Sequence, residues 1–197
     1  MQKILSGLLF LTLPAFSAPA EDLDLLPVQD RNQLFADAGN RTGVARKTRD
    51  VLARPAVPGE IVVTLIRGEG EETRSKPAEA GDWVVQNICD ATGNEEILVK
   101  KTAFTRRYGS ALTPSDSGNR QRFRPQGEPM DYLVITQEKP FVIIAPWGEK
   151  QRVMKGDVLL RSRQDPQDSY RIQKAAFDCT YQVITSAGGL TYSPGKT

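Results

Sequence analysis

A short pattern occurs twice in the chain, and this duplication constrains the fold more than any other feature. Residues 81–85, Gly-Asp-Trp-Val-Val, are echoed 75 residues later by residues 156–160, Gly-Asp-Val-Leu-Leu. Farther on, residues 97–108 match residues 170–181 at an offset of 73, with Lys, Ala, Phe and Tyr in the same order. A chance likeness between two β-rich stretches is the alternative. The duplication predicts two units with the same fold.

Each copy predicts a β-hairpin followed by a short helix. A Gly-Asp pair opens the copy, since glycine tolerates a positive φ and aspartate can hydrogen-bond nearby backbone. Turns are expected at residues 90–94 and 165–168, and return strands at 97–99 and 170–172. An aromatic pair spaced i, i+4 then lies on one helix face. The motif residues are Gly81, Asp82, Trp83, Phe104 and Tyr108 in the first copy, and Gly156, Asp157, Phe177 and Tyr181 in the second.

The sequence therefore predicts a mainly β, α+β fold. Two tandem small units are expected, each a hairpin-based sheet or half-barrel of three to four strands with a short helix, packed into one body. We expect Trp83, Phe104 and Tyr108 to form the first core, and Val158, Leu159, Phe177 and Tyr181 the second. We expect an N-terminal segment at residues 21–54, with a helix near residues 27–37. The first repeat then spans residues 55–108, a linker spans 109–129, the second repeat spans 130–185, and a flexible tail spans 186–197.

The repeated pattern resembles the PGDYG-domain family of bacteria, which is named for a Pro-Gly-Asp-Tyr-Gly motif. Residues 155–159 and 177–181 carry the likeness in the second copy, and residues 81–85 and 104–108 carry it in the first. Ala80 and Lys155 stand in place of the proline, and Trp83 and Val158 in place of the tyrosine. The resemblance implies an architecture in two degenerate copies, and it implies no defined activity and no catalytic residues.

The first twenty residues have the layout of a secretory signal peptide. Lys3 provides a short positive region, an apolar run extends from residue 4 to residue 16, and Ala18 and Ala20 provide small residues before a cleavage site. A buried helix or a membrane span is the alternative, but a span needs about 20 apolar residues. We expect cleavage after Ala20 and a periplasmic or secreted protein without a transmembrane segment after cleavage.

An oxidising compartment changes how the two cysteines are interpreted. The chain has two cysteines and no Cys-x-x-Cys motif, so the compartment favours one internal bond, Cys89–Cys179. Two separate buried thiols or an intermolecular link are the alternatives. Because Cys179 matches Arg106 in the first copy, the bond would belong to the contact between the units and would set how they pack.

The absence of histidine limits the chemistry. A chain without His has no Ser-His-Asp triad, no Cys-His pair and no His-ligated zinc, and a net charge of +2 gives no strong field for nucleic acid. No catalytic, cofactor-binding or metal residue is assigned, and no cofactor is expected. Remaining candidates for acid–base chemistry are the carboxylate pairs Glu71/Glu72, Glu95/Glu96 and Asp82/Asp157, although Glu95 and Glu96 are expected on an exposed hairpin and the aspartates as turn caps.

Exposed aromatic and basic side chains could instead form a binding surface. Trp147, Phe123, Arg122 and Arg124 are the candidates, and a solvated face balanced by acids is the alternative. We expect a non-enzymatic binding or scaffolding module whose partner is an envelope protein or an anionic polymer. The alternative is a His-free, carboxylate-based hydrolase of envelope glycan or peptide. A cleft between the repeats with two converging carboxylates would favour the enzyme, and a shallow aromatic surface would favour binding.

Overall fold

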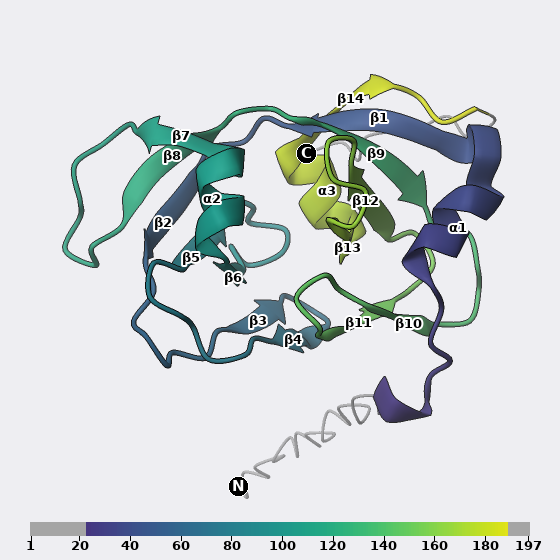
Figure 1. The fold of residues 1–197 in the computed structure, drawn as a ribbon, viewed down its shortest axis with the longest axis horizontal. Coiled ribbons are helices and arrows are strands. Elements are labelled where there is room, and N and C mark those ends of the chain that lie inside the picture. Colours follow the sequence, from purple (N-terminus) through teal and green to yellow (C-terminus); the bar gives the residue numbers. More distant parts are fainter. Residues whose placement is uncertain (1–22, 189–197) are drawn as a thin grey trace, which may run out of the picture.

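Two five-stranded antiparallel sheets and two two-stranded hairpins make up most of the computed structural model, which describes residues 23–188 (Figure 1). The chain is mainly β, as the sequence predicts. The helices are η1 (Leu23–Leu25), α1 (Arg31–Ala38), η2 (Gly39–Arg41), α2 (Lys101–Arg107) and α3 (Lys174–Thr180). The strands are β1 (Thr42–Lys47), β2 (Val51–Pro55), β3 (Val63–Ile66), β4 (Gly70–Arg74), β5 (Trp83–Asn87), β6 (Glu96–Val99), β7 (Tyr108–Ala111), β8 (Gln121–Pro125), β9 (Pro129–Val134), β10 (Phe141–Ile144), β11 (Lys150–Val153), β12 (Val158–Ser162), β13 (Ser169–Ile172) and β14 (Tyr181–Thr185).

The duplicated pattern forms the hairpin and helix that the sequence predicts. Strand β5 pairs with β6, and β12 pairs with β13, and each hairpin leads into a short helix and a further strand. Gly81 and Gly156, which precede the hairpins, both have φ of 92°, a conformation that side chains other than glycine rarely adopt. The aspartates that follow cap turns: Asp82 accepts from the Glu79 amide at 2.9 Å, and Asp157 from the Met154 amide at 2.7 Å.

The two repeats exchange their first strands. One sheet has the order β6-β5-β2-β8-β7, and the other β13-β12-β9-β1-β14. If β1 to β7 are repeat one and β8 to β14 repeat two, then β8 lies between two strands of repeat one and β1 lies between two strands of repeat two. The repeats can therefore separate only by withdrawing an inner strand from each sheet, which would break backbone hydrogen bonds on both sides of that strand.

The exchanged strands lie in segments that the sequence analysis left outside the repeats. Strand β1 and most of β2 fall within residues 21–54, and β8 within residues 109–129. Each sheet consequently has five strands, one or two more than expected. The expected helix is present but begins at Arg31, because the Asp30 side chain accepts from the Asn32 and Gln33 amides and caps it. The signal-peptide residues and most of the expected tail lie outside the described residues.

Each sheet packs its helix through the predicted aromatic pair. In repeat one, Phe104 and Tyr108 are buried, and Trp83 stacks on Phe104 with ring centroids 4.2 Å apart. In repeat two, Phe177 is fully buried and stacks on Tyr181. One residue predicted for the second core, Leu159, lies elsewhere.

Leu159 does not belong to the core that contains Phe177. It packs with Phe35 and Phe141 on the opposite face of the sheet, because neighbouring residues in a strand point to opposite faces and Val158 takes the helix side. Helix α1 and the β10–β11 hairpin cover that second face. The sheet of repeat two is therefore buried on both sides.

Candidate functional site

A cavity of about 660 Å³ lies between the two repeats. Helices α2 and α3 contribute to its wall, as do the β3–β4 hairpin of repeat one and the segment after β10 in repeat two. In Figure 1 the two helices face the space between the repeats, and the hairpins β3–β4 and β10–β11 meet below them. Strand β4 contacts β11 there. Both repeats are thus needed to form the cavity.

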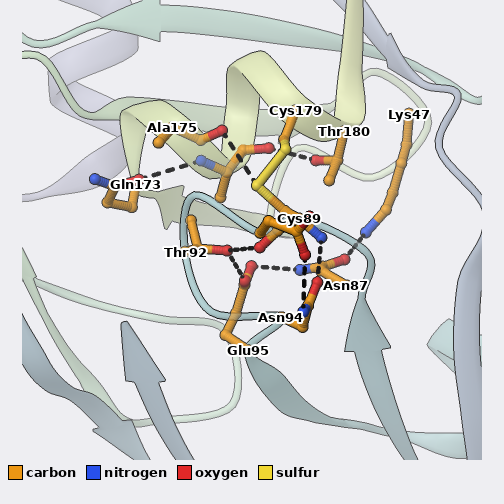
Figure 2. Close-up of a disulfide and its surroundings, with 12 residues drawn as sticks. Lys47, Asn87, Cys89, Thr92, Asn94, Glu95, Gln173, Ala175, Cys179 and Thr180 are labelled. Carbon is orange, nitrogen blue, oxygen red and sulfur yellow. Dashed lines mark hydrogen bonds between the residues drawn. A yellow bond between two sulfur atoms is a disulfide. The ribbon is translucent and has the colours of Figure 1, made fainter. Parts of the chain in front are cut away.

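A disulfide bond joins the repeats beside this cavity. Cys89 follows β5 in repeat one, and Cys179 lies on α3 of repeat two (Figure 2). Their Cα atoms are 5.8 Å apart, inside the range that disulfides span. The pairing predicted from the sequence is confirmed.

The loop that carries Cys89 is held in one conformation by its own polar groups. Asn94, which has φ of 58°, accepts from the Cys89 amide through Oδ1 at 2.8 Å, and its own amide donates to the Cys89 carbonyl. The Thr92 hydroxyl, which has one proton to donate, lies within hydrogen-bonding reach of both the Cys89 carbonyl and the Glu95 carboxylate. Asparagine tolerates the left-handed region better than other non-glycine residues, which explains its place in this loop.

Lys47 points toward this loop from the end of β1 (Figure 2). Its Nζ donates to Asn87 Oδ1 at 2.6 Å, and Asn87 Nδ2 donates to Glu95 at 2.7 Å. All three residues line the cavity. Burial lowers the pKa of Lys47 to about 8, so the side chain still carries its charge at pH 7.

Three tyrosines line the cavity near Lys47. Tyr181 is the cross-strand partner of Lys47 in the β1–β14 register, so the two side chains lie on one face of the sheet. The hydroxyls of Tyr170 and Tyr181 are 3.2 Å apart, and Lys47 Nζ lies 6.0 Å from the centre of the Tyr108 ring. Burial raises the pKa of Tyr108 to about 12 and that of Tyr181 well above its usual value. Tyr108 and Tyr181 are therefore neutral at pH 7.

On the α2 side of the cavity, two arginines meet one carboxylate. Arg106 and Arg107 both donate to Asp168, in the loop before β13, and the Arg107 guanidinium lies 5.0 Å from the centre of the Tyr170 ring. Arg106 Nε is also 3.7 Å from Glu128. Because Arg106 matches Cys179, this ion pair occupies the place that the disulfide takes on the other side.

A buried arginine connects the β3–β4 hairpin to repeat two. Arg171 donates to Asp157 at 2.9 and 3.0 Å and to Glu72, and its Nη2 is 3.3 Å from Glu69. Burial opposes the charge of Arg171, but these carboxylates outweigh it and raise its pKa. Asp157, expected only as a turn cap, therefore also neutralises a buried charge.

The carboxylates suggested for catalysis are mostly engaged in structure. Glu95 is 5% exposed, so the expectation of an exposed hairpin was wrong for it; the Lys47–Asn87 pair and Thr92 enclose it. Glu71 pairs with Arg74 on the surface, and Glu96 pairs with Arg120. Glu72 and Glu95 both line the cavity, and burial raises the pKa of Glu72 against the influence of Arg171. Within residues 23–188, no group of three or more acidic or cysteine side chains could hold a metal ion.

The proposed aromatic–basic surface is not assembled as expected. Phe123 is 4% exposed, because it packs edge-on against Trp83 and Phe104 in the first core. Trp147 is exposed, as expected, and lies near Tyr170 at the cavity. Arg122 and Arg124 remain on the surface beside Asp50, away from Trp147.

Sequence reasoning missed Lys47 and Asn87. Residues 43, 45 and 47 alternate inward on β1, and a lysine at an inward position of a strand is unusual. That signal lies in the N-terminal segment of residues 21–54, for which the sequence predicts a helix and no strand. Asn87 gives no signal of its own, since polar residues at strand ends are common.

No helix among residues 23–188 is long and apolar enough to cross a membrane. Comparisons of this chain with protein-family models, with curated proteins and with solved structures found no match, so the site is defined by its own geometry.

Proposed function

We propose that the protein is a periplasmic or secreted, non-enzymatic binding module, and that its ligand occupies the cavity between the repeats. The cavity of about 660 Å³ carries this proposal. Its volume falls within the range of small-molecule sites, about 300–1,000 Å³. Its lining combines apolar side chains with many charged and polar groups, which can bind and orient a polar ligand.

The framework around the cavity also suits a binding role. The strand exchange and the Cys89–Cys179 bond fix the two repeats relative to each other, so the walls are largely pre-formed. A pre-formed site loses little conformational entropy when a ligand binds. The proposal includes the secretory signal, because a disulfide bond fits an extracytoplasmic compartment. It also includes the interpretation of the two repeats as PGDYG-like.

Native mass spectrometry tests the proposal. The mature protein, exported with its own leader and purified gently, should carry a small-molecule mass that is lost on denaturation. Ala103→Trp, which adds bulk on the cavity side of α2, should remove that mass. Thr105→Trp is the matched control, because Thr105 is exposed on the same helix and does not line the cavity. Equal ligand retention by both variants would contradict the proposal.

The runner-up is a carboxylate-based hydrolase acting on envelope glycan or peptide. One observation favours it: Glu72 and Glu95 line one cavity, and burial raises the pKa of Glu72, as a general acid requires. Against it, Glu72 binds Arg171, and Glu95 accepts from Asn87 and Thr92. Glu95→Gln should leave ligand retention intact under the binding proposal and should abolish turnover of cell-wall fragments under the enzyme proposal.

A further inference from the structure

We propose that the cavity recognises the carboxylate of a small monoanionic molecule with an apolar body, and that Lys47 Nζ with the neighbouring tyrosine hydroxyls forms the carboxylate subsite. This inference rests on the proposed function, because it names the ligand class of the same cavity. Four observations support it, beginning with the surroundings of Lys47.

Lys47 has donors to spare. An ammonium group has three N–H donors, and among residues 23–188 one of them is used, toward Asn87 Oδ1. Among the described residues, no carboxylate lies within the 4.0 Å ion-pair distance of Lys47 Nζ. Glu95 is reached only through the Asn87 amide.

The other cationic side chains that line the cavity are each paired with a carboxylate of the protein. Arg106 and Arg107 share Asp168, and Arg171 is bound by Asp157 and Glu72. Lys100 pairs with Asp82 at 3.0 Å, and Lys76 is 4.0 Å from Glu149. A charge that is partly removed from water is costly unless it is paired, so an external anion is favourable at the partly buried Lys47.

Two tyrosine side chains lie beside this lysine. Tyr181 is its cross-strand partner, and the Tyr108 ring lies beneath its Nζ. The Tyr108 side chain is 5% exposed and lines the cavity. Since a phenol at pH 7 can donate, these hydroxyls can hydrogen-bond an anion without adding charge.

The rest of the lining restricts the anion to one charge and an apolar body. Glu95 also faces the cavity and accepts from the neutral Asn87 amide, so a second negative charge on a ligand held at Lys47 would be repelled by it. Apolar side chains from both repeats complete the wall: Val62, Ile97, Met130 and Ile172. A carboxylate attached to a hydrocarbon or aromatic group satisfies both conditions, and a phosphate monoester or a sugar does not.

Three probes with one tail and different head groups test the inference. Calorimetric titration of the oxidised mature protein at pH 7 would compare octanoate, octan-1-ol and octylammonium. We expect octanoate to bind at least tenfold more tightly than octan-1-ol, and octylammonium to bind more weakly still. Equal affinity for octanoate and octan-1-ol, or no binding of any probe, would overturn the inference.

Variants locate the subsite. Lys47→Met should weaken octanoate at least tenfold and leave octan-1-ol unchanged, whereas Arg46→Met, one residue earlier on β1 and exposed, should change neither. Tyr181→Phe removes only a hydroxyl and provides a second test if the Lys47 variant folds poorly; a threefold to tenfold loss for octanoate is expected. If Ala103→Trp abolishes octanoate binding but neither subsite variant affects it, the cavity function stands and the carboxylate subsite is wrong. If Ala103→Trp has no effect on binding, the proposed function itself fails.

Discussion

The two sides of the repeat interface use equivalent positions for different chemistry. On one side, Cys179 of α3 is bonded to the loop between β5 and β6. On the other side, Arg106 at the matching position of α2 forms an ion pair with Asp168 in the loop between β12 and β13. The duplicated framework thus provides two equivalent helix-to-loop contacts, and the individual residues decide how strong each one is.

The same difference extends into the cavity. Beside the ion pair, Arg106 and Arg107 are neutralised by protein carboxylates. Beside the disulfide, Lys47 meets a neutral amide. The Cys89–Cys179 bond joins the two repeats on that side, so Lys47 is not required there to form an ion pair between them. One side of the interface therefore serves stability, and the other can hold a cation available for a ligand.

The largest expected effect concerns the matched aromatic residues. Phe177→Ala should lower the free energy of unfolding by about 3–5 kcal/mol, because the ring is fully buried, and Phe104→Ala should have a similar effect. Chemical denaturation measures both. Because the exchanged strands join the sheets, both variants should shift one common transition, and two separate transitions would contradict the interlocked arrangement. A loss below about 1 kcal/mol for Phe177→Ala would contradict its burial in the core.

Removing the disulfide should have the next largest effect. The Cys89→Ala/Cys179→Ala variant should lose about 2–5 kcal/mol of stability, since the bond closes a loop with a sequence separation of 90 residues. The parent protein with reductant should show the same loss, whereas the variant should not respond to reductant. Equal melting temperatures for the parent with and without reductant would show that the bond does not stabilise the fold. The variant should nevertheless stay a single body, because the exchanged strands remain.

The ion pair on the opposite side should contribute less. Asp168→Asn keeps the shape and removes the charge that Arg106 and Arg107 share, and the expected loss is about 1–3 kcal/mol, because the group is only partly exposed. A double-mutant cycle with Arg106→Met would separate the pairwise interaction from the loss of each side chain. A loss larger than that of the disulfide variant would reverse the comparison.

Lys47 should give stability a particular pH dependence. Its pKa falls from 10.5 in the unfolded chain to about 8 in the folded protein, so between these values the unfolded state binds more protons and stability rises with pH. The rise should be about 1–3 kcal/mol between pH 8 and pH 10, and it should be absent in Lys47→Met. Charged or titratable groups on neighbouring elements are Glu95, Arg107, Tyr108, Tyr170 and Tyr181.

Above pH 10 the tyrosines should reverse this trend. Burial raises the folded-state pKa of Tyr108 to about 12 and that of Tyr181 above its usual value, so the unfolded chain loses these protons first and stability falls. Denaturation midpoints measured from pH 7 to pH 11 would therefore pass through a maximum.

Octanoate affinity should fall as pH rises through about 8, where Lys47 loses its charge. An affinity that stays constant to pH 10 would contradict the carboxylate subsite.

The smallest effect is expected on the surface. Arg124→Ala should change stability by less than about 0.5 kcal/mol, because its ion pair with Asp50 is exposed to solvent and screened. Its binding of octanoate should equal that of the parent, since it lies outside the cavity lining. This variant is the baseline against which the interface variants are compared.

Features that depend on local pattern can be predicted from the amino-acid sequence alone. The Gly-Asp turns at residues 81 and 156, the hairpins and the aromatic pairs follow from backbone preference and from spacing on a strand or a helix, and these act over a few residues. The Cys89–Cys179 pairing followed from counting, because two cysteines allow one internal bond.

Features that depend on residues far apart in the chain are set by the packing of the whole fold. Which sheet receives β1 or β8 is set by pairing over long distances, and nothing in the local sequence of residues 42–47 indicates a strand from the other repeat's sheet. Phe123 reads as an exposed aromatic among arginines until β8 enters the first sheet and buries it. Lys47 becomes a cavity residue for the same reason: only the exchange brings β1 beside Tyr181, and only the packed repeats bring Asn87 within hydrogen-bonding distance of it.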